Sequence, residues 1–115
     1  MDAFEEMLNA LERIAEEGEK QVSEGGGLSE SKILGGLGEN PAAAGQVYSL
    51  LSKGYKENLE RVKWLAEWLE KIPDEPRLRE LCIRFGAIGY HLAAIMNKIE
   101  NLYYKEYTEG NAGDE

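Results

Sequence analysis

The chain has 115 residues, of which 30% are charged, and its net charge is −9 at pH 7. This length suits one domain with a single hydrophobic core. The lone cysteine, Cys82, excludes an internal disulfide framework and a cysteine metal cluster, and the lone histidine, His91, leaves too few ligands for an ordinary zinc site. We therefore expect neither a metal nor a cofactor.

The first residues do not resemble a targeting segment. They lack the basic and apolar regions of a secretory signal, and no run in the chain approaches the ~20 apolar residues that are needed to cross a bilayer. We expect a cytoplasmic protein that does not contact a membrane.

Charge is unevenly distributed along the chain. Residues 1–39 carry a net charge of −7, whereas residues 53–84 carry +1. The overall negative charge disfavours loose electrostatic binding of nucleic acid. If the chain binds a polyanion, we expect the contact in its middle section.

The first predicted element is an amphipathic helix over residues 2–23, ended by three consecutive glycines. Its apolar face consists of Phe4, Met7, Leu8, Leu11, Ile14, Ala15 and Val22. Residues 24–45 contain seven glycines. We interpret them as a flexible connector outside the packed bundle, in which a short helix can form over residues 28–34.

Two longer helices are predicted over residues 41–72 and 76–107. Asn40 and Pro41 are typical of a helix start, and Pro73 stops the first of the two. The segment between them is short, so the second helix should return antiparallel to the first. The apolar stripe of the second helix, in steps of three and four, consists of Leu78, Leu81, Phe85, Ile88, Leu92, Ile95, Ile99 and Leu102.

No stretch alternates apolar and polar residues as a strand would. The prediction is an all-α fold, a bundle of three main helices with a short extra helix in the glycine-rich linker. It forms a single domain over residues 1–109, followed by a disordered acidic tail over residues 110–115. A strip of small residues, Gly86, Gly89 and Ala93, permits close packing of another helix. That helix can belong to the same bundle, which is the usual case, or to a second copy of the chain, which would make the strip a self-association face.

Arg84 and His91 lie seven residues apart on nearly the same helical face. This spacing resembles the Arg-x4-6-His signature of HEPN ribonucleases, in which two subunits contribute the motif. The resemblance implies that Arg84 steadies a phosphate and that His91 assists proton transfer. Phe85 departs from the family, which commonly has a polar residue there. The alternative is a surface arginine and a histidine satisfied within the helix packing.

A second resemblance extends over residues 28–109. The segments that carry it are Leu-Ser-Glu-Ser-Lys-Ile at 28–33, Trp-Leu-Ala-Glu-Trp-Leu-Glu-Lys at 64–71, Glu-Pro-Arg-Leu-Arg at 75–79 and Leu-Tyr-Tyr-Lys-Glu-Tyr at 102–107. Their order and composition resemble the small helical subunit of type III-A CRISPR-Cas interference complexes. Leu34 departs from that family, which has an arginine at this place.

The resemblance implies a non-catalytic subunit of an RNA-guided ribonucleoprotein in antiviral defence. Such a subunit contacts the guide and target RNA backbone and neighbouring protein subunits. The positions that match the family's RNA contacts are Lys32, Lys71, Arg77, Arg79 and Lys105. Cations on rigid helices are the side chains that phosphate binding requires.

A third interpretation needs no RNA. Long acidic amphipathic helices, with Trp64 and Trp68 beside the apolar stripe, also suit a helical adaptor that binds another protein by groove packing. The partners that we expect are therefore other subunits of a complex, RNA, or a second copy of the chain.

Overall fold

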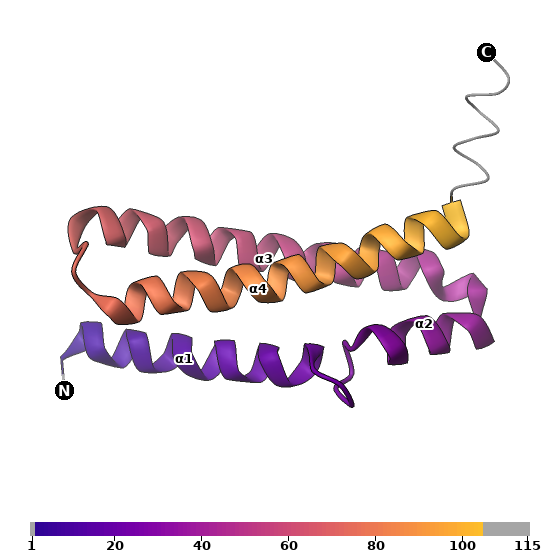
Figure 1. Cartoon of the computed structure of the whole chain (residues 1–115), viewed down its shortest axis with the longest axis horizontal. Coiled ribbons are helices and arrows are strands. Elements are labelled where there is room, and N and C mark those ends of the chain that lie inside the picture. The colour runs from indigo at the N-terminus through magenta and orange to yellow at the C-terminus, as the bar shows by residue number, and fades with distance from the viewer. Residues whose placement is uncertain (1, 105–115) are drawn as a thin grey trace, which may run out of the picture.

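The computed structural model describes residues 2–104, which form helices joined by short turns and contain no β-strand (Figure 1). The main helices are α1 (Ala3–Val22), α2 (Glu30–Glu39), α3 (Ala44–Lys71) and α4 (Pro76–Ile99). A 3₁₀ turn at Pro41–Ala43 precedes α3, and a π-helical turn at Glu100–Tyr104 follows α4. The all-α prediction is confirmed.

Local signals explain where the helices begin. The Asp2 side chain accepts a hydrogen bond from the Glu5 amide at 2.8 Å and so caps α1. Ser29 caps α2 through the amide of Lys32, and the Glu75 side chain caps α4, with Pro76 at its first position. The predicted helix starts therefore lie close to the observed ones.

The interpretation of residues 24–45 as a connector outside the packed bundle is wrong for α2. This helix extends to Glu39, beyond the predicted residues 28–34, and buries Ile33 and Leu37 in the core. Glycine weakens a helix by about 1 kcal/mol per residue relative to alanine. α2 contains three glycines, so this loss amounts to about 3 kcal/mol. Burial of each large apolar side chain stabilises by about 1.5–3 kcal/mol, so Ile33 and Leu37 together offset it.

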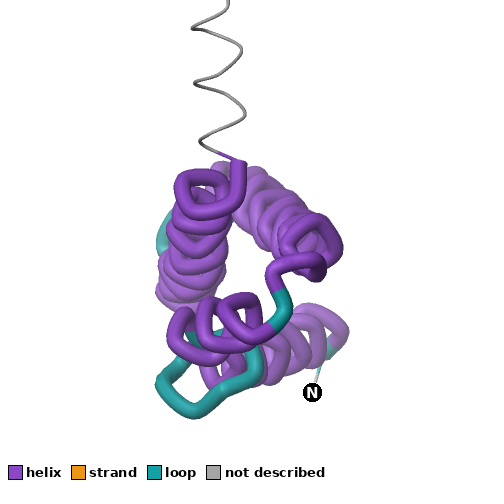
Figure 2. The backbone as a smooth tube through the Cα atoms, turned by 90° about the vertical axis from the view of Figure 1, so that its right-hand side faces the viewer, coloured by secondary structure: helices purple, strands orange, loops and turns teal. Residues whose placement is uncertain are grey.

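α4 is the central helix of the bundle. α3 packs along it in the antiparallel direction, as predicted, and α1 packs along it in the parallel direction (Figure 1). α2 continues the line of α1 after a sharp turn, and the end-on view places α3 and the α1–α2 pair on different sides of α4 (Figure 2). The largest fully buried side chains are Leu8, Leu37, Leu51, Leu65, Leu78, Leu81, Phe85, Ile95 and Ile99.

The end of α4 differs from the predicted helix over residues 76–107. The α-helix ends at Ile99, and the π-helical turn follows it. There Glu100 accepts a hydrogen bond from the Tyr48 hydroxyl, which links this turn to α3. Residues 105–107 and the predicted tail over residues 110–115 lie outside the described residues.

Candidate functional site

Four basic side chains of α4 recur at every seventh position: Arg77, Arg84, His91 and Lys98. We call them the basic row. Seven residues make two helical turns, so the row follows one side of α4. Three of its members form the ion pairs Arg77–Glu12, Arg84–Glu19 and Lys98–Glu30 with α1 and α2. The row therefore ties α4 to the two N-terminal helices.

Arg77, a predicted RNA contact, is bound within the chain. Its Nε donates to Glu12 Oε1 at 2.7 Å, and its Nη2 donates to Asn9 Oδ1 at 2.6 Å. The hydrogen bond from Arg77 lowers the pKa of the Glu12 carboxyl. These bonds use two of the five N–H donors of Arg77, and the Glu12 carboxylate offsets its positive charge, which disfavours contact with an RNA phosphate.

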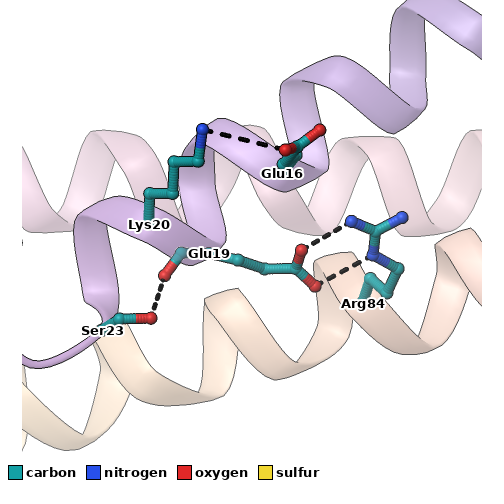
Figure 3. Close-up of polar contacts among 5 residues, drawn as sticks. All are labelled: Glu16, Glu19, Lys20, Ser23 and Arg84. Carbon is teal, nitrogen blue, oxygen red and sulfur yellow. Dashed lines mark hydrogen bonds and ion pairs between the residues drawn. The ribbon is translucent and has the colours of Figure 1, made fainter.

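Arg84, the candidate for phosphate contact in a ribonuclease site, is also bound within the chain. Its Nε and Nη2 donate to the two carboxylate oxygens of Glu19 at 2.9 and 2.5 Å (Figure 3). His91 lies about 10 Å further along the helix axis, and its Nε2 is buried with no hydrogen-bond partner in the described part of the chain. The structure thus uses Arg84 as a link between helices and does not direct it toward His91.

The other predicted RNA contacts lie apart from one another. Lys32 donates to the Gly25 carbonyl at 2.8 Å, Lys71 lies 5.4 Å from the centre of the Trp68 ring, and Arg79 donates to the Pro73 carbonyl at 3.4 Å. Within residues 2–104, none of these three side chains forms an ion pair with a carboxylate. Lys105 lies outside the described residues.

An apolar groove with a volume of about 450 Å³ lies between α1 and α3. Both helices pack along α4. They meet at one end, where the rings of Phe4 and Trp68 lie 5.6 Å apart. The groove is lined by Met7, Leu11, Glu57, Glu60, Arg61 and Trp64. Its lining is mostly apolar, with carboxylates at the α3 edge.

Ion pairs neutralise three members of the basic row, but the charged residues that line this groove do not form such pairs. Glu57 and Glu60 form no ion pair within residues 2–104. Arg61 is held over the buried ring of Phe85, with its Cζ 5.5 Å from the ring centre, and donates to Asn58. With Arg61, these two carboxylates give the α3 side of the groove a net charge of −1, and both carboxylates are available to a ligand.

Sequence reasoning assigned the apolar side of α1 to the core and so missed the groove. The apolar stripe of α1 is wider than its contact with α4 requires. Leu8 and Ala15 are fully buried, whereas Ile14 is 43% exposed. The width of that stripe is the signal that could have revealed a second apolar surface.

No family model, curated protein or solved structure matches the chain. Within residues 2–104, no three histidine, cysteine or acidic side chains are grouped so that they could hold a metal ion. In the same part of the chain, no helix combines the length and the apolar character that a membrane span requires.

The Arg84–Glu19 pair predicts a pH dependence of stability. The hydrogen bond from Arg84 lowers the pKa of Glu19 below its ordinary value of 4.5. A carboxyl with a lowered pKa in the folded state stabilises fully above pH 4.5, and the stabilisation is lost as pH falls through the folded-state pKa. We expect a coupling of about 1 kcal/mol between Arg84→Met and Glu19→Gln at pH 7, and almost none at about pH 3. Urea unfolding of the four variants measures it.

The exposed pair of Glu16 and Lys20, at 3.7 Å on the surface of α1, is the matched control (Figure 3). The corresponding cycle of Glu16→Gln and Lys20→Met should give a coupling of only about 0.2–0.5 kcal/mol. A coupling between Arg84 and Glu19 that stays constant from pH 7 to about pH 3 would contradict the prediction.

Proposed function

We propose that this chain is a non-catalytic protein-binding module that holds a short basic amphipathic helix of a partner protein in the groove between α1 and α3. The observation that carries this proposal is the groove itself. Met7, Leu11 and Trp64 form an apolar surface between two helices, and at its edge lie two carboxylates that form no ion pair in the described part of the chain. Amphipathic helices bind to such grooves through apolar residues spaced three, four and seven positions apart.

The dimensions of the groove suit part of one helix. The α3 wall extends from Glu57 to Trp64, two helical turns or about 10 Å, and the α1 wall extends from Met7 to Leu11, about 6 Å. Two or three apolar side chains of a partner helix fit over this length. An interface this small predicts weak, reversible binding.

The charge at the groove selects the chemistry of the partner. Glu57 and Glu60 lie on the α3 side, and the whole chain carries −9. A partner helix with lysine or arginine beside its apolar face would be attracted to this rim, whereas an acidic helix would be repelled. We therefore assign the groove to a basic amphipathic helix.

The test uses an 18-residue peptide with leucine on one helical face and lysine on the other, and a second peptide with glutamate in place of lysine. The chain contains two tryptophans, and Trp64 lines the groove, so their emission should shift to the blue when the lysine peptide binds. We expect the glutamate peptide to bind at least tenfold more weakly at 150 mM salt.

Charge reversal supplies the matched control. Glu57→Lys together with Glu60→Lys should weaken binding of the lysine peptide about tenfold. Glu67→Lys together with Glu70→Lys makes the same change of net charge at exposed positions of α3 outside the groove, and we expect it to have little effect. Equal loss in the two double variants, or unchanged tryptophan emission, would refute the proposed function.

RNA contact, in a subunit of an RNA-guided ribonucleoprotein, is a second candidate function. It is favoured by Lys32, Lys71 and Arg79, whose cationic groups contact carbonyl oxygens or a ring and not carboxylates. If this proposal is correct, the triple change of these residues to alanine should lower RNA affinity and reduce the salt slope of binding, whereas Arg77→Ala should change it little. Equal effects of both changes would argue against it.

A further inference from the structure

The outward side of α4 carries a second stripe of residues in steps of three and four. It consists of Ile83, Gly86, Tyr90, Ala93 and Asn97, and we call it the outer stripe. Between Cys82 and Asn97 the charged or basic side chains are Arg84 and His91, both members of the basic row on another side of the helix. The outer stripe is therefore an uncharged surface on a chain in which 30% of the residues are charged.

Large and small residues alternate along the outer stripe. Ile83 is 67% exposed and Tyr90 is 78% exposed. At Gly86, a Cβ atom would meet nothing within 4 Å. A hollow beside the stripe is lined by α3 residues that include Leu59 and Val62, and by Gly86 and Ala93. The surface thus has projecting side chains next to open notches.

We propose that the outer stripe binds a second copy of this chain, with the two α4 helices antiparallel about a twofold axis. In that arrangement the numbers of facing residues have a constant sum. Tyr90 then lies over Gly86 of the second copy, and Ile83 lies over Ala93 of the second copy, because both pairs sum to 176. Every large residue of the stripe meets a small one, and the symmetry produces each contact twice.

The length of the outer stripe and its lack of charge also favour a second copy of the chain as its partner. The stripe from Ile83 to Asn97 is about 21 Å long, and a contact of this length is small for a specific interface. We expect a dimer that dissociates in the micromolar range. Two chains of charge −9 repel each other, and an uncharged stripe is where they approach with the least repulsion. Salt should therefore strengthen this association, whereas it should weaken binding of the basic helix to the groove.

Sedimentation velocity over a concentration series tests the proposal. Ile83→Glu should weaken the dimer at least tenfold. The matched control is Leu50→Glu on α3, which is 69% exposed and outside the stripe, and it should leave the dimer unchanged. Equal effects of the two changes, or a wild-type chain that stays monomeric at about 1 mM, would overturn the proposal.

The Gly86→Leu variant distinguishes an interface with complementary packing from nonspecific hydrophobic association. A Cβ atom at this position meets nothing within 4 Å in the single chain, so we expect the fold to be retained, and circular dichroism checks this. It fills the notch that Tyr90 of the second copy needs, and the dimer should weaken at least tenfold. If the contact were unspecific, the larger apolar surface would strengthen association, and that result would refute the proposed packing.

Cross-linking tests the direction of the helices. In a Cys82→Ser background, chains with Gly86→Cys and chains with Tyr90→Cys should form a mixed disulfide-linked dimer when they are oxidised together. Each chain oxidised alone should form much less. Preferential linkage between two Tyr90→Cys chains would indicate parallel helices and contradict the antiparallel arrangement. These readouts do not involve the groove, so they fail or succeed independently of the proposed function.

Discussion

Gly26→Ala is expected to detach α2 from the bundle and to lower the free energy of unfolding by at least ~2 kcal/mol. A Cβ atom at this position would lie 2.2 Å from the Lys20 carbonyl oxygen and 2.3 Å from that of Gln21. Both are backbone atoms of α1 and cannot rotate away. The turn must therefore open.

The same turn is held by backbone hydrogen bonds that its opening would break. The Gly26 amide donates to the Ser23 carbonyl at 2.8 Å, and the Leu28 amide donates to the Gln21 carbonyl at 2.8 Å. Urea unfolding measures the loss of stability, and amide hydrogen exchange should show faster exchange in α2 than in α3.

Gly35→Ala is the matched control within α2. A Cβ atom there would meet nothing within 4 Å, and alanine favours a helix interior by about 0.5–1 kcal/mol over glycine. We expect this substitution to stabilise the chain. Equal effects of the two glycine substitutions would show that the close contact at Gly26 does not constrain the turn.

Phe85→Ala is expected to lower the free energy of unfolding by about 3–5 kcal/mol. Phe85 is 1% exposed and lies at the centre of α4, under the guanidinium of Arg61. Its removal leaves a cavity between α3 and α4 and takes away the ring that holds Arg61 in place. Urea unfolding at low chain concentration measures the effect.

Two further variants test the same prediction if the Phe85→Ala variant does not fold. Phe85→Leu removes less volume and should cost about 1 kcal/mol. Leu50→Ala, at a position that is 69% exposed, should change stability by less than about 0.5 kcal/mol. A loss at Phe85 no larger than that at Leu50 would mean that the α3–α4 seam does not carry the stability of the bundle.

The two proposed surfaces use different sides of the bundle. The groove is formed by α1 and α3, whereas the outer stripe lies on α4, with Leu59 and Val62 of α3 beside it. A dimer through the outer stripe would therefore leave both grooves open. Such a dimer could hold two partner helices at once, which raises the effective concentration for a partner with two such helices.

The periodicity of apolar residues predicted the long helices well, because each long helix packs mainly through one apolar stripe. The apolar stripe of α4 recurs in steps of three and four from Leu78 to Ile99, and all seven members of it are buried. Pro73 and Pro76 mark the turn that makes α3 and α4 antiparallel neighbours. Local pattern and tertiary contact agree there.

The glycine-rich segment was predicted less well, because tertiary packing there outweighs the low helix propensity of glycine. Gly35, Gly36 and Gly38 predict a flexible segment, yet Ile33 and Leu37 on the same short stretch are buried against the rest of the core. The energy of that burial depends on surfaces that lie far away in the sequence. A prediction from the neighbouring residues alone cannot include this burial energy.

Helical periodicity, caps and prolines are local signals, and from them the all-α fold and the positions of α1, α3 and α4 can be predicted. The roles of the charged residues depend on how the helices pack. Arg77 and Arg84 are seven residues apart, as are Glu12 and Glu19, but only the parallel packing of α1 on α4 pairs them. Glu57 and Glu60 line the groove and form no ion pair within residues 2–104. A charge acts through its distance to other charges, and for residues 65 positions apart in sequence the fold sets that distance.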